Sequence, residues 1–162
     1  MAIIRIRWSR PYDLDSINGL SNSEDYGVYQ IYGHHAVYGA GTLLYIGMVE
    51  KSSFSTRINQ HKDDWFRYNE DQSKIEIYVG RLIGEKTPSA NELSKQINNA
   101  EKLLIYAHAP VYNTENKTSI PDELEDVHVV NYGNYRSLMP EVSGTAWTKA
   151  ANKKYLEWSE YK

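Results

Sequence analysis

Two short tyrosine-bearing segments constrain this chain most. Residues 27–32 (Gly-Val-Tyr-Gln-Ile-Tyr) and 42–47 (Thr-Leu-Leu-Tyr-Ile-Gly) are rich in the β-branched and aromatic residues that favour β-strands. The stretch 33–41 between them begins and ends with glycine, which is typical of a hairpin with a long loop. The sequence therefore predicts two neighbouring strands that each carry a tyrosine, Tyr29 and Tyr45.

The segment that follows the hairpin changes to helical periodicity. Its bulky apolar residues recur at helical spacing, at Phe54, Ile58, Trp65 and Tyr68. Arg57 and His61 are separated by one helical turn, so they lie on the same side of this predicted helix. The predicted hairpin and helix thus bring one arginine, one histidine and two phenols together.

Alternating patterns elsewhere predict further strands. Residues 74–83 alternate clearly enough to form a third strand that completes a small sheet. Residues 3–8 and 127–132 also have strand-like patterns, whereas 135–143 look irregular. The chain is predicted to end in an amphipathic helix whose apolar stripe is Trp147, Ala151, Tyr155 and Trp158.

A longer amphipathic helix is predicted between Ser89 and Pro110. Its apolar stripe is Leu93, Ile97, Ala100 and Leu104. Glu101 lies beside this stripe, where an unpaired charge would be costly to bury. The carboxylate is therefore expected either to pair with Arg57 or Lys102, or to bind a metal ion.

These residues, in this order, resemble the signature of the GIY-YIG nuclease family. Gly27-Val28-Tyr29 stands for its first half and Tyr45-Ile46-Gly47 for its second. The family places an arginine on the helix that follows, here Arg57. Some restriction and homing members add a histidine one turn later, here His61. Five elements in the right order are a far more specific signal than any single tripeptide.

The resemblance continues to the predicted long helix. The family expects a glutamate on a helix and then an asparagine, which here are Glu101 and Asn113. The likeness thus spans about residues 27–113. One departure is that fifteen residues separate Tyr29 from Tyr45, where the family has about ten or eleven. The resemblance implies an α/β (α+β) fold of GIY-YIG type, a small three-stranded antiparallel sheet flanked by helices, with extra elements at both ends.

The resemblance also implies roles for four of these residues. Glu101 would hold a single divalent ion, Mg²⁺ or Mn²⁺, with water completing the oxygen shell that such ions prefer. Arg57 would donate to phosphate oxygens with its planar, permanently charged fork. Tyr45 would position substrate or water. Asn113 would orient Glu101 or the hairpin by hydrogen bonding.

Two residues compete for the role of general base. The family's base corresponds to Tyr29, but a free phenol has a pKa near ~10, so a nearby cation would have to lower it. His61 titrates close to neutrality without such help, and it serves either as the rival base or as the hydrogen-bond partner of Tyr29.

Candidate contacts to DNA phosphates are the lysines Lys51, Lys149, Lys153 and Lys154. The net charge of −3 is unusual for a DNA-binding protein, but the charges are segregated. Arg5, Arg7 and Arg10 lie in a stretch without acids, and acids cluster at 122–126. The arginines fit either a solvated strand face or a DNA contact.

With 162 residues, of which 41% are hydrophobic, the chain fits one domain over 1–162, with a core at about 27–113 and an extension at 114–162. The absence of cysteine excludes disulfides, thiolate zinc sites and cysteine nucleophiles. No apolar run approaches the roughly 20 residues of a membrane span, so the expected location is the cytoplasm, without membrane contact.

The predicted function is that of a divalent-metal-dependent DNA endonuclease, a phosphodiester hydrolase of the stand-alone restriction type. Cutting both strands with one site per chain calls for a homodimer. One alternative is a repair or mobile-element nuclease that acts on nicked or branched DNA. Another is a non-catalytic DNA-binding domain that retains the fold, an alternative that the acidic balance favours.

Overall fold

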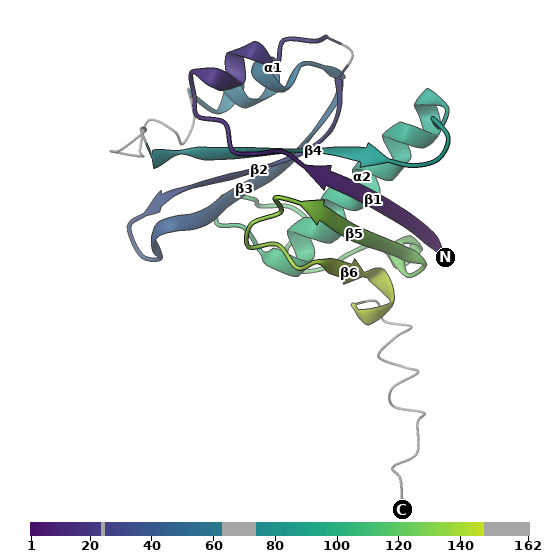
Figure 1. The fold of residues 1–162 in the computed structure, drawn as a ribbon. Helices are drawn as coiled ribbons and strands as arrows, with labels where there is room; N and C mark the ends of the chain where they lie inside the picture. The colour runs from purple at the N-terminus through teal and green to yellow at the C-terminus, as the bar shows by residue number, and fades with distance from the viewer. Residues whose placement is uncertain (24, 63–73, 148–162) are drawn as a thin grey trace, which may run out of the picture.

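The computed structural model describes residues 1–23, 25–62 and 74–147, which form one sheet with helices on both faces (Figure 1). The strands are β1 (Ala2–Trp8), β2 (Asp25–His35), β3 (Gly39–Ser52), β4 (Glu76–Ile83), β5 (Val127–Gly133) and β6 (Glu141–Ser143). The α-helices are α1 (Phe54–Asn59) and α2 (Ala90–His108). Short 3-10 turns lie at Ser16–Gly19, Gln60–Lys62, Asp122–Leu124 and Gly144–Ala146.

The prediction of a small three-stranded antiparallel sheet flanked by helices is wrong. The described strands form a six-stranded mixed sheet, in the order β3-β2-β4-β1-β5-β6, which twists and curls (Figure 1). The three expected strands β3, β2 and β4 are adjacent and antiparallel, but β1 pairs with β4 instead of leaving that edge open. β5 then pairs with β1 in parallel, and β6 pairs with β5.

The burial pattern of β1 explains why the sheet continues past β4. Ile4, Ile6 and Trp8 are almost completely buried, while Arg5 and Arg7 between them are exposed. This buried face fixes the register of β1, and β4 and β5 extend the same apolar surface on its two sides. Strands predicted at 3–8, 74–83 and 127–132 are confirmed as β1, β4 and β5.

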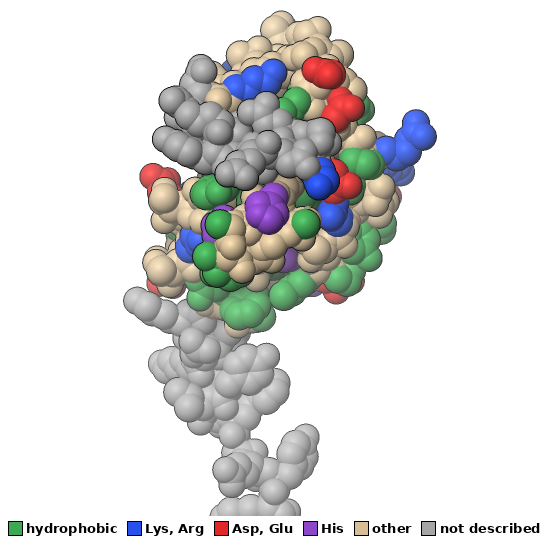
Figure 2. Space-filling model, turned by 90° about the vertical axis from the view of Figure 1, so that its left-hand side faces the viewer, with side chains coloured by type: hydrophobic (Ala, Val, Ile, Leu, Met, Phe, Trp, Pro, Cys, Tyr) green, Lys and Arg blue, Asp and Glu red, His purple; other side chains and the backbone are tan. Residues whose placement is uncertain are grey.

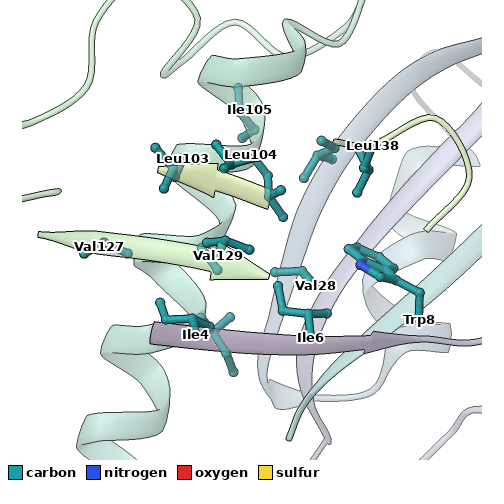
Figure 3. Close-up of a cluster of buried hydrophobic side chains, with 14 of the residues drawn as sticks. Ile4, Ile6, Trp8, Val28, Leu103, Leu104, Ile105, Val127, Val129 and Leu138 are labelled. Carbon is teal, nitrogen blue, oxygen red and sulfur yellow. The ribbon is translucent and has the colours of Figure 1, made fainter. Parts of the chain in front are cut away.

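Helix α2 covers one face of the sheet and contributes five buried residues to the main core, Ile97, Ala100, Leu103, Leu104 and Ile105. Ser89 caps its first turn by accepting a hydrogen bond from the Glu92 amide, so the helix predicted between Ser89 and Pro110 is confirmed. Its apolar side packs on the buried residues of β1, β2 and β5. Figure 3 shows this cluster, which includes Ile4, Ile6, Trp8, Val28, Leu103, Leu104, Ile105, Val127, Val129 and Leu138.

A second, smaller core lies on the opposite face, under α1. It contains Tyr29, Ile31, Val49, Phe54, Ile58, Ile77 and Val79, together with Ile17 and Ile75. Val28 and Tyr29 therefore enter different cores, as the alternation of side chains along a strand requires. The face with α1 is the one that receives Tyr29.

The β2–β3 hairpin is longer than predicted, and its turn is shorter. The strands run to His35 and resume at Gly39, so most of the expected loop 33–41 is strand, with register shifts that absorb extra residues. Val37 and Tyr38 at the tip are highly exposed. Figure 2 faces this end of the sheet, where histidine side chains lie among hydrophobic ones.

Some predictions fall at other places or outside the described residues. The stretch predicted to be irregular, 135–143, ends in strand β6. Trp65, Tyr68 and the predicted C-terminal helix lie outside the described residues, as do Lys149, Lys153 and Lys154. Within the described ranges, no helix is both long and apolar enough to span a membrane.

Candidate functional site

The hairpin holds Tyr29 and Tyr45 side by side on the α1 face. Their ring centroids are 6.1 Å apart, and the rings are nearly stacked. Tyr29 lies opposite Gly47 in the strand register. A Cβ atom at Gly47 would clash with the Tyr29 hydroxyl, so the phenol occupies space that only glycine leaves open.

His61 closes the site from the turn that follows α1. Its Nε2 lies 2.9 Å from the Tyr29 hydroxyl, and its ring centroid is 4.6 Å from that of Tyr45. His61 is 7% exposed and Tyr29 is fully buried. The predicted histidine and the two predicted tyrosines are therefore in contact, but two of the three are shielded from solvent.

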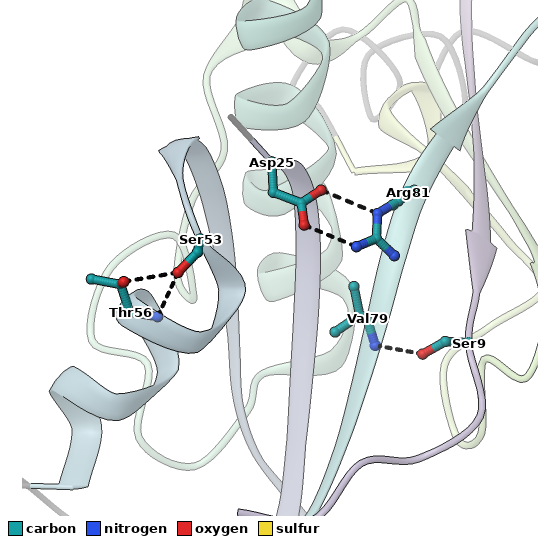
Figure 4. A network of polar contacts seen from close by, with 6 residues as sticks. All are labelled: Ser9, Asp25, Ser53, Thr56, Val79 and Arg81. Carbon is teal, nitrogen blue, oxygen red and sulfur yellow. Dashed lines mark hydrogen bonds and ion pairs between the residues drawn. The ribbon is translucent and has the colours of Figure 1, made fainter. Parts of the chain in front are cut away.

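Arg57 is presented by α1, whose start is fixed by a side-chain cap. Ser53 accepts a hydrogen bond from the Thr56 amide at 2.9 Å, and its hydroxyl donates to the Thr56 hydroxyl (Figure 4). One turn into the helix, Arg57 donates to Gln60 at 2.8 Å, and its positive charge acts on the Tyr29 hydroxyl. The capping residue Ser53, Arg57 and His61 therefore all lie within α1 and the turns at its two ends.

These contacts determine the pKa of Tyr29. Burial is the largest cause that raises the pKa of Tyr29 above its ordinary value, and the nearby Tyr45 adds to the rise. Arg57 opposes it but does not overcome it. The Tyr29 hydroxyl and Nε2 of His61 share one hydrogen bond of 2.9 Å, in which either group donates according to the tautomer of the histidine ring.

Glu101 reaches the site from α2. Burial raises the pKa of its carboxyl to about 7, while Arg57, Lys102 and a hydrogen bond from the Met48 amide act in the opposite direction. Glu115 adds a repulsive negative charge. Glu101 is thus a shielded carboxyl that gains from a nearby positive charge.

Asn113 acts on the backbone of β3. Its side-chain oxygen accepts from the Ile46 amide at 2.9 Å, and its amide nitrogen donates to the Ile46 carbonyl at 2.8 Å. The Tyr112 amide donates to the Leu44 carbonyl, and the Glu101 carboxyl accepts from Met48. Together these groups occupy the outer edge of β3, which would otherwise be an open edge strand. Asn113 therefore orients the hairpin rather than Glu101.

A cleft of about 560 Å³ lies between β3, α1 and α2. Four predicted site residues line it: Tyr45, Arg57, Glu101 and Asn113. Tyr29 and His61 are buried and do not line it. Lys51 is exposed in a left-handed conformation (φ 55°) between Glu50 and Ser52, which line the cleft, but does not itself line it.

The sequence did not reveal Glu115, which also lines the cleft and acts on both Glu101 and Tyr45. The only signal for it in the sequence is its position two residues after Asn113. Glu50, which accepts a hydrogen bond from Ser94, was missed for the same reason: an acid in a polar or alternating segment has no distinctive pattern.

The cleft suits a divalent ion held by one carboxylate and water. Glu101 offers a shielded carboxyl whose pKa is raised by burial, and it faces an open, polar space. Within residues 1–23, 25–62 and 74–147, no group of three or more His, Cys, Asp or Glu side chains forms a full protein cage. A Mg²⁺ that keeps most of its water matches this donor set better than Zn²⁺ does.

Comparison of this chain with protein-family models, curated proteins and solved structures gives no match.

Proposed function

We propose that this protein is a divalent-metal-dependent DNA endonuclease, whose site residues follow the GIY-YIG pattern. The proposal rests on one observation. One cleft is lined by four residues that are far apart in the sequence: Tyr45 of β3, Arg57 of α1, Glu101 of α2 and Asn113 of the segment that follows α2. Residues chosen for packing alone have no reason to converge on an open polar space.

Cleavage of a phosphodiester requires that charge on the phosphoryl oxygens be neutralised. In the proposed mechanism Arg57 donates to these oxygens at the mouth of the cleft, where it is exposed. Glu101 would hold Mg²⁺, which when bound supplies positive charge for the phosphate and for the leaving 3′ oxygen. Tyr45, which lines the cleft, orients the attacking water.

The Tyr29–His61 pair takes up the proton of the attacking water. Because the pKa of Tyr29 is raised, a free phenolate is not the base. In the proposed relay, the attacking water enters beside Tyr45 and gives its proton to the buried phenol oxygen of Tyr29. The phenol's own proton crosses the hydrogen bond to Nε2 of His61, which lies 2.9 Å from that oxygen. The pair gains one proton in total, and the phenol stays neutral throughout.

The direct test is cleavage of supercoiled plasmid by the purified protein with Mg²⁺ or with EDTA. Glu101→Gln keeps an oxygen that accepts from the Met48 amide but removes the charge, so it is expected to fold and to lose cleavage. Glu92→Gln on the exposed first turn of α2 is the matched control. Discrete fragments would indicate a restriction-type enzyme. Full cleavage by Glu101→Gln would contradict the metal assignment.

A second candidate function is a non-catalytic DNA-binding domain. The observation that favours it is that Glu101 and Asn113 both bond to the backbone of β3, a structural task that needs no chemistry. This candidate predicts binding of duplex or branched DNA without cleavage under any divalent metal, and an affinity that Glu101→Gln leaves unchanged.

A further inference from the structure

A row of arginines lies on the same face of the sheet as α1. On β1, Ile4, Ile6 and Trp8 belong to the core under α2, so the exposed Arg5 and Arg7 between them project from the opposite face. On β4, Arg81 has the same parity as Val79 of the α1 core, and its guanidinium lies 5.1 Å from the Phe54 ring centroid. Since Phe54 begins α1, the row starts beside the helix that carries Arg57.

The strand register places these charges next to one another. Arg7 is directly opposite Arg81 in the antiparallel β1–β4 pair, at a Cα separation of about 5 Å. Arg5 is two residues, about 7 Å, further along β1. On the other side, Arg7 pairs with Tyr132 of β5, an exposed ring on the same face. The arginine row, defined as Arg5, Arg7 and Arg81, is thus one continuous strip.

Folding alone does not account for this arrangement. Like charges directly opposite each other destabilise a sheet. Asp25 offsets one of them, because it receives two hydrogen bonds from Arg81, at 3.2 and 2.9 Å (Figure 4). Neither Arg5 nor Arg7 forms an ion pair with any residue in the described part of the chain. An anion bound from outside would remove the remaining repulsion.

The surface around the arginine row has room for such a ligand. A groove of about 520 Å³ contains Arg5, Arg81 and Lys86, and an adjoining hollow of about 680 Å³ contains Arg5 and Arg7. Glu85 is the one acid that lines the hollow, and neither space contains another among its lining residues. The local charge is therefore strongly positive on a protein whose net charge is −3.

We propose that the arginine row binds the phosphate backbone of duplex DNA that extends out of the cleft. This inference rests on the proposed function for the identity of the polyanion. The regularly spaced phosphates of DNA match arginines that lie along β1 and on the neighbouring β4. The exposed Tyr132 at the end of the arginine row adds contact to sugar or base edges. The row extends the DNA contact from Arg57 across β4 to β1.

The test is DNA binding by the full chain, measured by fluorescence anisotropy in EDTA over a salt series, so that no cleavage interferes. Arg5→Gln/Arg7→Gln is expected to bind duplex about tenfold or more weakly at low salt, and to reduce the slope of log K against log salt by about 1.8, since each lost phosphate contact removes about 0.9. Arg5→Lys/Arg7→Lys keeps both charges and is expected to keep most of the slope.

Lys95→Gln, a single exposed charge on α2, is the control for net charge. Equal affinity and slope for Arg5→Gln/Arg7→Gln and wild type would overturn the inference, as would an equal loss for Lys95→Gln. Weakened binding to anionic vesicles with unchanged DNA binding would also overturn it and indicate a membrane surface. If wild type binds DNA through the row but never cuts it, the proposed nuclease function fails while the arginine row stands.

Discussion

At the scale of single residues, the structure changes the role of Tyr29 most. The sequence pattern predicts that Tyr29 is a general base, a role for which the pKa of its phenol would have to be lowered. The structure buries the ring completely and raises that pKa, while placing the hydroxyl on His61. The two candidate bases are therefore one hydrogen-bonded pair, and the question of which of them is the base becomes a question about a shared proton.

Removal of the Tyr29 hydroxyl is expected to break this pair. Tyr29→Phe should lower the single-turnover cleavage rate about 100-fold or more, the usual contribution of general-base catalysis. Tyr45→Phe, which loses only an orienting hydroxyl in the cleft, should cost less. Quenched-flow cleavage of a labelled duplex measures both rates. Equal losses in the two variants would mean that the proton does not pass through Tyr29.

The raised pKa of Glu101 predicts a pH-dependent stability. The folded protein holds this carboxyl at a pKa of about 7, above the ordinary 4.5. Its favourable contribution is therefore complete below about pH 4.5 and is lost as the pH rises through 7. Glu101→Gln should accordingly be more stable than wild type at pH 8, by about 3 kcal/mol at most, and nearly equal to it at pH 4.

Urea denaturation at the two pH values measures this difference, with Glu92→Gln as the variant that should show none. Added Mg²⁺ should raise the stability of wild type at pH 8 and leave that of Glu101→Gln unchanged, because binding to the folded state alone stabilises it. A stability difference that grows toward acid pH would show that Glu101 is stabilised as the carboxylate.

At the scale of elements, the β2–β3 hairpin has the two paired strands that the sequence predicts, but its strands are longer and its turn is shorter. Alternation located both strands, because a half-buried strand requires it. The sequence predicts too long a loop, because Gly33 and Gly41 are typical of strand ends. In the structure Gly33 lies within β2, and Gly39 and Gly41 adopt positive φ within β3. Glycine is common both at β-bulges and at turns, so the sequence alone does not distinguish a bulge within a strand from the loop that ends it.

Gly47 has a different purpose, which gives a prediction about the hairpin. Its missing side chain admits the Tyr29 hydroxyl, so Gly47→Ala should force the phenol out of place and destabilise the fold by about 1–3 kcal/mol. Gly19→Ala is the matched control, because nothing lies within 4 Å of an added Cβ there. Urea denaturation compares the two. Equal stabilities would show that Tyr29 can move aside at no cost.

The edge of β3 depends on a side chain from outside the hairpin. Asn113→Ala should leave the amide and the carbonyl of Ile46 without partners in a buried place, at a cost of about 1–3 kcal/mol. Amide hydrogen exchange at Ile46 should be faster in Asn113→Ala than in wild type, because the amide loses its acceptor. Thr114→Ala, at the exposed neighbouring position, should change neither quantity. Unchanged exchange at Ile46 in Asn113→Ala would mean that another group already covers this edge.

At the scale of the whole molecule, the sequence could not reveal how its strands are ordered. The individual strands β1, β4 and β5 were recognisable, but the parallel pairing of β1 with β5 joins residues more than 120 positions apart. Local periodicity carries no information on which strand lies beside which. The same holds for the bond from Trp8 to Asn131, at 2.8 Å, which fixes this pairing from within the core.

This order makes the region of family likeness an incomplete unit, because β1 lies between β4 and β5 at the middle of the sheet. A fragment of residues 27–113 would expose the side of β4 that pairs with β1, and would remove Ile4, Ile6 and Trp8 from the core under α2. We expect this fragment to lack cooperative thermal unfolding by circular dichroism, whereas the full chain unfolds in one transition. A cooperative transition in the fragment would mean that β3, β2, β4 and α2 suffice, and that the terminal strands were added to a unit already stable without them.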